Sequence, residues 1–320
     1  MTKIWAWVAA GCAMLATASA GADTYPSRII TMIVPFQAGS GTDAVARIFA
    51  QELGQALNGR IVIENKAGAN GAIAAAGVAR AEPDGYTLFM TTNTSHSANP
   101  SLMKNISYDP VRDFAPITRG GNLPFMLVVN PAIPVASVAE LIAYAKSRPG
   151  ELSYGYGNST GIVAGETFKR ASGINVLKVP YRSTPPAITD VVGGRLAYMF
   201  VDLASGLAQV KSGNLRALAV TTQERSAILP DLPSMKEAGL PDFDLTSWNG
   251  LFAPAKTPPE IVNRLNAEMR RIIAKPDVKA RLAEIGFDAF SSTPDELGVF
   301  VQSELVKWTR LIKEAGIEPE

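Results

Sequence analysis

Residues 29–57 read IITMIVPFQAGSGTDAVARIFAQELGQAL, and this stretch decides the fold class. Ile29–Val34 is a continuous apolar, β-branched run, which is typical of a strand covered on both faces. From Thr42 to Leu57 the apolar side chains recur at helical spacing, which predicts a helix with one buried face. The stretch therefore predicts a strand–loop–helix unit, the building block of an α/β protein.

The same alternation of strand-like and helix-like segments continues to about residue 220, and three helix-like segments end the chain. The last of them begins with a capping box at Thr293–Glu296. Such alternation predicts mostly parallel sheets with helices on both faces. A chain of about 300 residues is long for one such sheet, so we expect two domains. The turn-rich stretches near 116–124 and 241–250 are the candidates for crossings between them.

Residues 1–22 have the features of an export signal. Lys3 is the only charged residue among them, and it precedes an apolar run from Ile4 to Leu15. Small residues follow, so cleavage after Ala20 or Ala22 fits the usual pattern. The apolar run is shorter than the roughly 20 residues that a spanning helix needs. We therefore expect a signal peptide at 1–22 and an exported mature protein without a membrane anchor.

The charge and cysteine content exclude several function classes. The chain has 30 basic and 29 acidic residues, so removal of Lys3 leaves 29 of each and a net charge of zero. A neutral chain without a basic run is unsuited to a nucleic-acid partner. The single cysteine, Cys12, lies in the signal, so we expect no disulfide and no thiol chemistry. One histidine and no calcium-loop spacing predict no metal and no cofactor.

The segment Pro35–Asp43 joins the first strand to the first helix. Backbone N–H groups at such a junction form a favourable site for an anion, and glycines let a ligand approach closely. No Gly-Lys-Ser/Thr follows, and Ala44 stands where a dinucleotide fingerprint has its third glycine, so neither nucleotide motif is present. Two interpretations remain open: an anion site, or a turn in which Thr42 or Asp43 caps the helix.

A second strand-to-helix junction spans Tyr154–Gly161. Within it, Gly157-Asn158-Ser159-Thr160-Gly161 matches G-x-S-x-G, the nucleophile elbow of α/β hydrolases. A serine of that kind needs a histidine downstream of it, and the one histidine, His96, lies 63 residues upstream. We therefore expect no enzyme, and a serine hydrolase is only a remote alternative.

Two further polar loops follow strands, where ligands collect in α/β proteins. One is Thr91–Asn99, in which the lone His96 is either a ligand contact or a hydrogen-bonded loop residue. The other is Val179–Pro186, in which Arg182 either pairs with a carboxylate or is solvated.

Motifs along nearly the whole mature chain resemble the Bug family, the extracytoplasmic receptors of tripartite tricarboxylate transporters. The motifs that carry this resemblance are Pro35–Asp43 with Arg47, Glu64–Gly71, Pro83–Leu88, Val179–Arg182, Gly193–Arg195, Arg216–Val220, Pro230–Ser234 and Glu237–Gly239.

The resemblance implies a fold similar to type II periplasmic-binding proteins: two sheet-plus-helix domains joined by two crossings, which close like a Venus flytrap. We place the first domain at 23–122 plus 250–320 and the second at 123–249. The implied function is a periplasmic receptor, acting as a monomer, that binds a small carboxylate (a di- or tricarboxylate, an amino acid or an aromatic acid) in the interdomain cleft. It would deliver this ligand to the membrane subunits of a tripartite transporter; the alternative is a sensor for a signalling partner.

Carried onto this chain, the family's two ligand loops fall on Gln37–Asp43 and Tyr156–Gly161. We expect one ligand carboxylate at the N–H groups of Gly39–Gly41, with Asp43 turned away to cap its own helix or to brace the loop. Ile162 stands where many members have histidine, and Ser183 where many have glycine, so no ligand is transferred from a relative. The expected ligand contacts are Phe36, Gln37, Gly39, Ser40, Gly41, Thr42, Asn93, Ser95, His96, Tyr156, Asn158, Ser159, Thr160, Tyr181 and Asp202.

Overall fold

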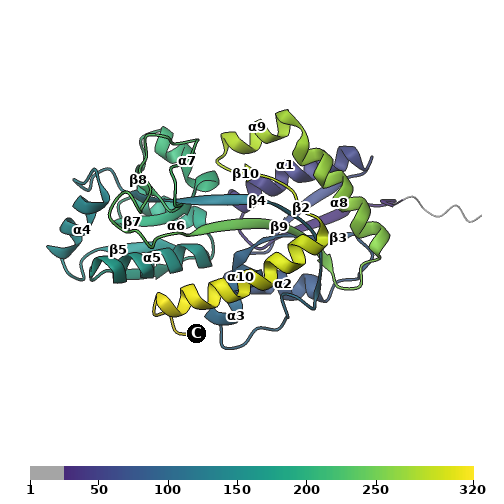
Figure 1. Cartoon of the computed structure of the whole chain (residues 1–320), viewed down its shortest axis with the longest axis horizontal. Helices are drawn as coiled ribbons and strands as arrows, with labels where there is room; N and C mark the ends of the chain where they lie inside the picture. The colour runs from purple at the N-terminus through teal and green to yellow at the C-terminus, as the bar shows by residue number, and fades with distance from the viewer. Residues whose placement is uncertain (1–24) are drawn as a thin grey trace, which may run out of the picture.

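The computed structural model describes residues 25–320, so the predicted signal peptide at 1–22 lies outside the described residues. The described chain forms two lobes, each a β-sheet with helices packed on it (Figure 1). The lobe at the right of that view holds the N-terminal strands, and the lobe at the left holds the middle of the chain. The predicted α/β architecture with two sheet-plus-helix domains is confirmed.

The sheet of the first lobe has the strand order β2-β1-β3-β9-β4, with β10 paired to β4. Its strands are β1 (Ile30–Val34), β2 (Ile61–Asn65), β3 (Thr87–Thr92), β4 (Phe114–Val129), β9 (Thr246–Pro254) and β10 (Asp288–Ala289). The accompanying helices are α1 (Gly41–Ala56), η1 (Ala69–Gly71), α2 (Ala72–Ala79), η2 (Thr94–Ala98), α3 (Asn99–Leu102), α8 (Pro259–Ala274), α9 (Pro276–Glu284) and α10 (Pro294–Glu314).

Strand β1 shows how the apolar run of residues 29–34 is used. Side chains of a strand point alternately to opposite faces of its sheet. Ile30 and Met32 pack in one cluster with the buried faces of α1 and α8, whereas Ile33 packs in another cluster with α2 and the start of α10. Both faces are therefore covered, which explains why this strand has no polar alternation.

The sheet of the second lobe has the order β8-β4-β7-β5-β6, in which the last part of β4 pairs with β8 and β7. Its other strands are β5 (Ser153–Tyr156), β6 (Leu177–Pro180), β7 (Tyr198–Asp202) and β8 (Arg216–Val220). Its helices are α4 (Val138–Lys146), α5 (Ser159–Ser172), α6 (Thr184–Val192) and α7 (Leu203–Lys211). Phe125 and Leu127 of β4 face one cluster and Met126 and Val128 face another, so this sheet is covered on both sides as well.

The chain crosses between the sheets in β4 and in β9. Residues Phe114–Pro124 of β4 pair with β9, and from Phe125 onward β4 pairs with β7 and β8 of the second lobe. These crossing strands run antiparallel to their neighbours, so the prediction of mostly parallel sheets is wrong near the lobe boundary. The stretch 116–124 is also strand rather than turn, because β9 pairs along it. The division of the domains at 122/123 and 249/250 stays a prediction.

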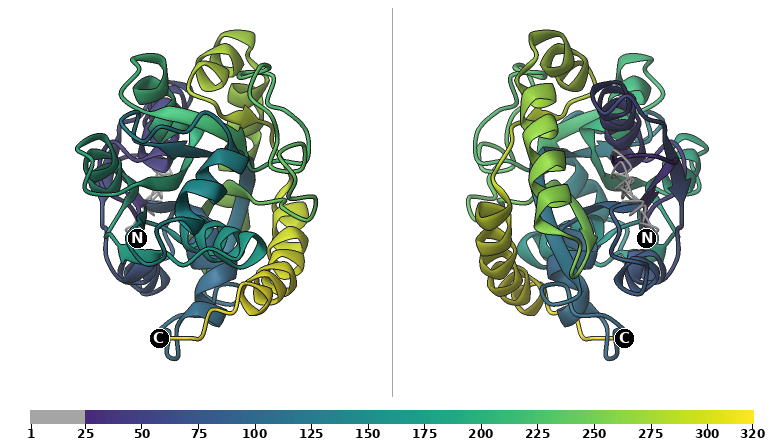
Figure 2. Two further views of the ribbon diagram at one scale, coloured as in Figure 1. Left: turned by 90° about the vertical axis from the view of Figure 1, so that its left-hand side faces the viewer. Right: turned by 90° about the vertical axis from the view of Figure 1, so that its right-hand side faces the viewer.

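Helix α10 belongs to both lobes. It begins with the predicted capping box, in which Thr293 and Glu296 bond reciprocally. Val301, near its start, packs in the first lobe, whereas Trp308 and Ile312 join the core of the second lobe. Both views of Figure 2 show this helix, in yellow, along one side of the molecule. The segment 250–320 is therefore not confined to the first lobe.

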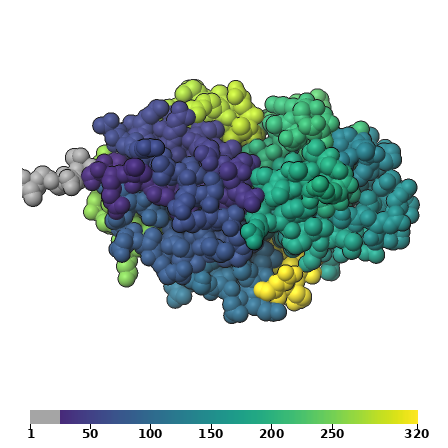
Figure 3. Space-filling view, turned by 180° about the vertical axis from the view of Figure 1, so that it is seen from behind, coloured from purple at the N-terminus to yellow at the C-terminus, as the bar shows by residue number. Residues whose placement is uncertain are grey.

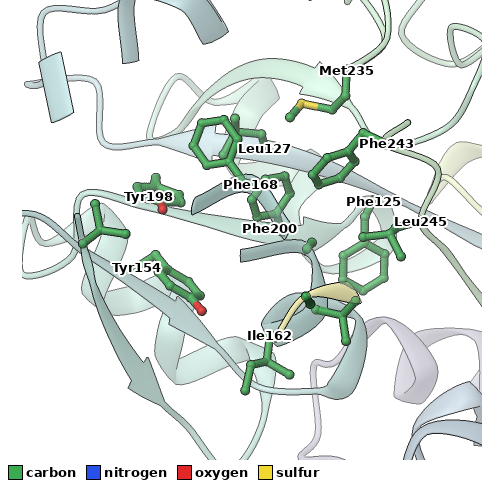
Figure 4. Packing of buried hydrophobic residues seen from close by; sticks show 14 of the residues in the cluster. Phe125, Leu127, Tyr154, Ile162, Phe168, Tyr198, Phe200, Met235, Phe243 and Leu245 are labelled. Atoms are coloured by element: carbon green, nitrogen blue, oxygen red, sulfur yellow. The ribbon is translucent and has the colours of Figure 1, made fainter. Parts of the chain in front are cut away.

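The core of the second lobe is rich in aromatic rings (Figure 4). Phe168 of α5 meets Phe200 of β7 edge-on, with 5.8 Å between ring centroids. Phe200 in turn stacks on Phe243 at 5.5 Å. Edge-on and offset arrangements are those that aromatic pairs prefer.

A buried carboxylate connects the crossing strand β9 to α10. Glu304 Oε2 accepts the indole N–H of Trp248 at 3.0 Å and that of Trp308 at 2.9 Å. All three side chains are buried. Charge-assisted bonds of this kind are about twice as strong as neutral ones, so Glu304 fixes the helix against the crossing.

Over residues 25–320, none of the helices combines the length and the apolar character needed to cross a membrane.

Candidate functional site

The two ligand loops predicted from the sequence face each other across the lobe boundary. Helix α1 of the first lobe contacts α7 of the second, and η2 of the first contacts α5 of the second. These helices begin directly after strands or their connecting loops: η2 after β3, α5 after β5 and α7 after β7. Helix N-termini and strand ends from both lobes thus meet at one place, which is where ligands bind in open α/β folds.

The loop before α1 is braced by the first helix itself. Asp43 Oδ2 accepts the N–H of Gly39 and the Nε–H of Arg47, each at 2.9 Å, and its Oδ1 accepts from Asn65 at 2.9 Å. Burial alone would raise the pKa of Asp43, but the bonds from Arg47, Gly39 and Asn65 hold this pKa below its usual value. Gly39 has φ of 82°, a left-handed conformation that favours glycine. The expectation that Asp43 turns away and braces the loop is confirmed.

The N–H groups of this loop already have protein partners. Those of Gly39 and Ser40 bond within the loop, to Asp43 and to the Gln37 carbonyl, and Ser40 Oγ accepts the N–H of Asp43. The N–H of Gly41 instead donates across the lobe boundary, to Ser205 Oγ of α7 at 2.7 Å. The expected set of three available N–H groups is therefore wrong for this arrangement, because the tight turn uses two of them.

A carboxylate from the second lobe lies against this helix start. Asp202 ends β7 and caps α7, where its Oδ1 accepts the Ser205 N–H at 2.8 Å and its Oδ2 accepts the Ser205 hydroxyl at 3.0 Å. The residue is 3% exposed, and burial raises its pKa to about 6. A Cβ atom placed on Gly41 would collide with Asp202 Oδ1. Only glycine at position 41 therefore allows the lobes to meet in this way.

Hydroxyl and amide groups connect the lobes at η2 and α5. Asn93 Nδ2 donates to Ser159 Oγ at 3.2 Å and to Thr160 Oγ1 at 3.0 Å. The hydroxyls of Thr94 and Ser159 bond to each other at 2.8 Å. A further link comes from Gln37, whose N–H donates to Ser183 Oγ at 3.2 Å. All of these bonds join opposite lobes, so they hold the cleft closed.

Two cavities lie at the lobe boundary. The inner cavity has a volume of about 10 Å³ and is lined by Phe36, Ser40, Gly41, Thr42, Asn158 and Asp202 among the expected contacts, and by Thr92, Thr94, Leu123, Phe125, Thr184 and Ser247. The outer cavity has a volume of about 260 Å³, and its lining includes Tyr156, Asn158 and Tyr181. Asn158 lines both cavities, so they adjoin at this residue.

His96 lies away from both cavities. Its ring is fully buried, stacks on Phe252 at 4.1 Å between centroids and lies 4.7 Å from Phe114. Neither ring nitrogen has a hydrogen-bond partner within residues 25–320, and burial lowers its pKa to about 3, so the imidazole is neutral. The segment after β3 is helical rather than a loop, which turns this side chain into the core. The structure therefore shows His96 neither as a ligand contact nor as a hydrogen-bonded loop residue, which were the two expectations. Ser159 also has no histidine beside it that could act as a base.

Two more of the expected contacts, Ser95 and Tyr181, bond to neighbours in their own lobe. Ser95 bonds to the hydroxyl of Thr91 in the interior. The Tyr181 hydroxyl donates to Asp190 at 2.6 Å, and Arg182 beside it is exposed.

Sequence reasoning missed the hydroxyl residues Thr94, Thr184, Ser205 and Ser247. Ser205 could have been found from its position three residues after Asp202, since this is the spacing of a helix cap. The other three are single hydroxyls with no motif of their own, and only the fold brings them to the boundary.

Within the described part of the chain, no three side chains of His, Cys, Asp or Glu gather into a group that could hold a metal ion.

Comparison with known proteins gives consistent matches. The model of the tripartite tricarboxylate transporter family receptor, TctC, matches residues 45–317. The protein BugT of Bordetella pertussis is 36% identical over 303 residues, which are 93% of this chain and 93% of BugT. Among solved structures, R. palustris Rpa4515 with adipate has a TM-score of 0.91 at 36% identity, covering 92% of this chain and 100% of that chain. MatC (Rpa3494) from Rhodopseudomonas palustris with bound malate has a TM-score of 0.85 at 32% identity, covering 90% of this chain and 100% of MatC.

Proposed function

The chain belongs to the family of tripartite tricarboxylate transporter receptors, whose members are extracytoplasmic solute-binding proteins and not enzymes, and on that premise we propose that it captures a small carboxylate between its two lobes. The protein acts in the periplasm as a monomer and delivers this ligand to the membrane subunits of a tripartite transporter. Relatives solved with adipate and with malate support a carboxylate ligand. Their similarity also confirms the predicted fold, similar to type II periplasmic-binding proteins.

The observation that carries the proposal is the start of α1 at the lobe boundary. The N-terminus of a helix carries partial positive charge and favours an anion. Gly41 presents its N–H there to a group of the opposite lobe rather than to its own loop. A ligand carboxylate that enters the open cleft can replace Ser205 as the acceptor, and each charge-assisted bond contributes about 1.5–3 kcal/mol.

The rest of the cleft supplies amide and hydroxyl groups. Asn93, Ser159 and Thr160 lie opposite one another across the boundary. No lysine or arginine lines either cavity in the described chain. Oriented dipoles and hydroxyls, rather than ion pairs, would therefore hold the anion.

The test is a thermal-shift and calorimetric screen of the mature protein against mono-, di- and tricarboxylates. A ligand at 100 times its Kd should add about 2.7 kcal/mol of stability. Gly41→Ala should weaken binding at least tenfold, because the new Cβ meets Asp202 and keeps the lobes apart. Gly77→Ala is the matched control, since a Cβ there has no atom within 4 Å and it should bind as wild type. Equal affinity of both variants would contradict the proposed site, and a large loss in Arg182→Ala would favour an ion-pair site instead.

A further inference from the structure

The outer cavity at the lobe boundary has walls from three separate parts of the chain. The first lobe contributes Asn70 and the end of α3, the second lobe contributes the loop after β5, and the C-terminal tail from Ile317 to Glu320 closes the third side. Its volume of about 260 Å³ is close to the lower end of the range of roughly 300–1,000 Å³ for small-molecule sites. Figure 3 shows the tail, in yellow, at the junction of the two lobes.

The tail is a fixed wall rather than a loose end. Glu320 donates its N–H to the Leu102 carbonyl and accepts the Lys104 N–H, both at 3.0 Å. Ile317, three residues before it, is buried in the core of the second lobe. The backbone position of Glu320 on this wall is therefore set by these two hydrogen bonds.

Most of the cavity wall is apolar or aromatic. The side chains that form this surface are Leu102, Met103, Tyr156, Ile162, Pro180 and Ile317. Three of the polar side chains among the lining residues are already bonded: Asn70 to Asn99, Tyr181 to Asp190, and Asn158 to both Gly161 and Thr184. An entering ligand thus meets a surface that offers contact area but few hydrogen-bond donors.

The charges at the outer cavity are negative. Glu318 and Glu320 line it, whereas no lysine or arginine does. Glu320 has one ionic contact, with the exposed Lys178 at 3.4 Å. Burial raises the pKa of Tyr156, and the charges of Glu320 and Glu166 raise it further, which is the response of an acid in a negative field. A second ligand carboxylate placed here would be repelled and would meet no lysine or arginine among the lining residues.

We propose that the outer cavity receives the apolar or aromatic body of the ligand, and that this receptor is selective for monocarboxylates over dicarboxylates of the same skeleton. The inference rests on the proposed function: the single carboxylate lies at the start of α1, and the body extends past Asn158 between Tyr156 and the C-terminal tail.

The experiment compares acids that share a skeleton, by calorimetry on the mature protein. The pairs are hexanoate with adipate, and 3-phenylpropanoate with its 4-carboxylated analogue. We expect each monocarboxylate to bind at least tenfold more tightly than its partner. Tyr156→Ala should weaken 3-phenylpropanoate at least tenfold, because it removes one wall of the cavity.

A charge reversal tests the electrostatic part. Glu318→Lys should shift the preference toward adipate at least tenfold, whereas Glu284→Lys, at an exposed position ending α9, should leave the ratio unchanged. Tighter binding of adipate than of hexanoate by wild type, or an unchanged ratio in Glu318→Lys, overturns this inference alone. If no acid of the panel binds, the proposed function falls with it.

Discussion

Asp202→Asn removes a carboxylate that the closed cleft buries against α1. The wild-type side chain is 3% exposed and bonds to the Ser205 backbone N–H and hydroxyl. Asparagine is also a good helix cap, so its Oδ1 keeps the bond to the backbone N–H. Its Nδ2 can donate to the Ser205 hydroxyl, as a protonated carboxyl would. The variant therefore imitates the protonated acid in shape and bonding.

The expected gain follows from the pKa of Asp202, which burial raises from 3.8 to about 6. Each pKa unit corresponds to about 1.4 kcal/mol, so burying the ionised form costs about 3 kcal/mol. Because the folded-state pKa lies above the unfolded one, the folded protein binds more protons between pH 4 and pH 6. Its stability therefore falls as pH rises through that window, and the whole loss is present at neutral pH. Asp202→Asn should be more stable than wild type by up to about 3 kcal/mol at pH 7.5 and about equal to it at pH 4.

The assay is urea unfolding of both mature proteins at the two pH values, without ligand. Asp190→Asn is a control of opposite sign, because bonds from Tyr181 and Arg195 lower the pKa of Asp190. That variant should be less stable than wild type at pH 7.5, and the deficit should shrink at low pH. An Asp202→Asn protein no more stable than wild type at pH 7.5, or a difference that does not change with pH, would refute the reasoning.

Two core substitutions give further tests. Phe168→Ala should destabilise the protein by about 3–5 kcal/mol, because a fully buried ring is lost from the aromatic core of the second lobe; a loss under 1 kcal/mol in urea unfolding would contradict the packing described. Glu304→Gln should cost about 1.5–3 kcal/mol, since two indole N–H groups lose their charged acceptor, whereas Glu314→Gln at an exposed position of the same helix should change little. Thermal melting, followed by circular dichroism, measures the difference in stability between the Glu304→Gln and Glu314→Gln variants.

Local patterns predicted the strand–helix units because the determining contacts are close in sequence. The capping box at Thr293 and the two-sided burial of β1 are examples, whereas α1 is capped by Ser40 and not by the expected Thr42 or Asp43. The stretch 116–124 reads as a turn because it contains Gly120, Gly121 and two prolines, yet pairing with β9 makes it a strand. Strand formation depends on pairing more than on intrinsic propensity. The sequence of this stretch alone therefore could not show that it forms a strand.

The site was predictable in its loops but not in its bonds. The glycine-rich start of α1 and the Asn158 loop were visible as strand-to-helix junctions, and both reach the boundary. The bond between Gly41 and Ser205 joins residues 164 positions apart, which no local pattern encodes. The prediction for His96 was wrong because its neighbours in sequence are polar and indicated a loop. Nothing in that pattern indicated that a π-helical turn would direct the ring into the core. The expected ligand contacts other than His96 stay predictions.

The shared carboxylate of Glu304 has an optical consequence. Trp248 lies on a crossing strand and Trp308 on the helix that spans both lobes, and residues 25–320 contain no other tryptophan. Indole fluorescence is sensitive to a nearby charge and to solvent, so any movement of β9 relative to α10 that lengthens the Trp248–Glu304 bond changes the emission. The protein thus carries its own chromophores beside the crossing strand, and the predicted closure of the lobes can be tested in real time without a label.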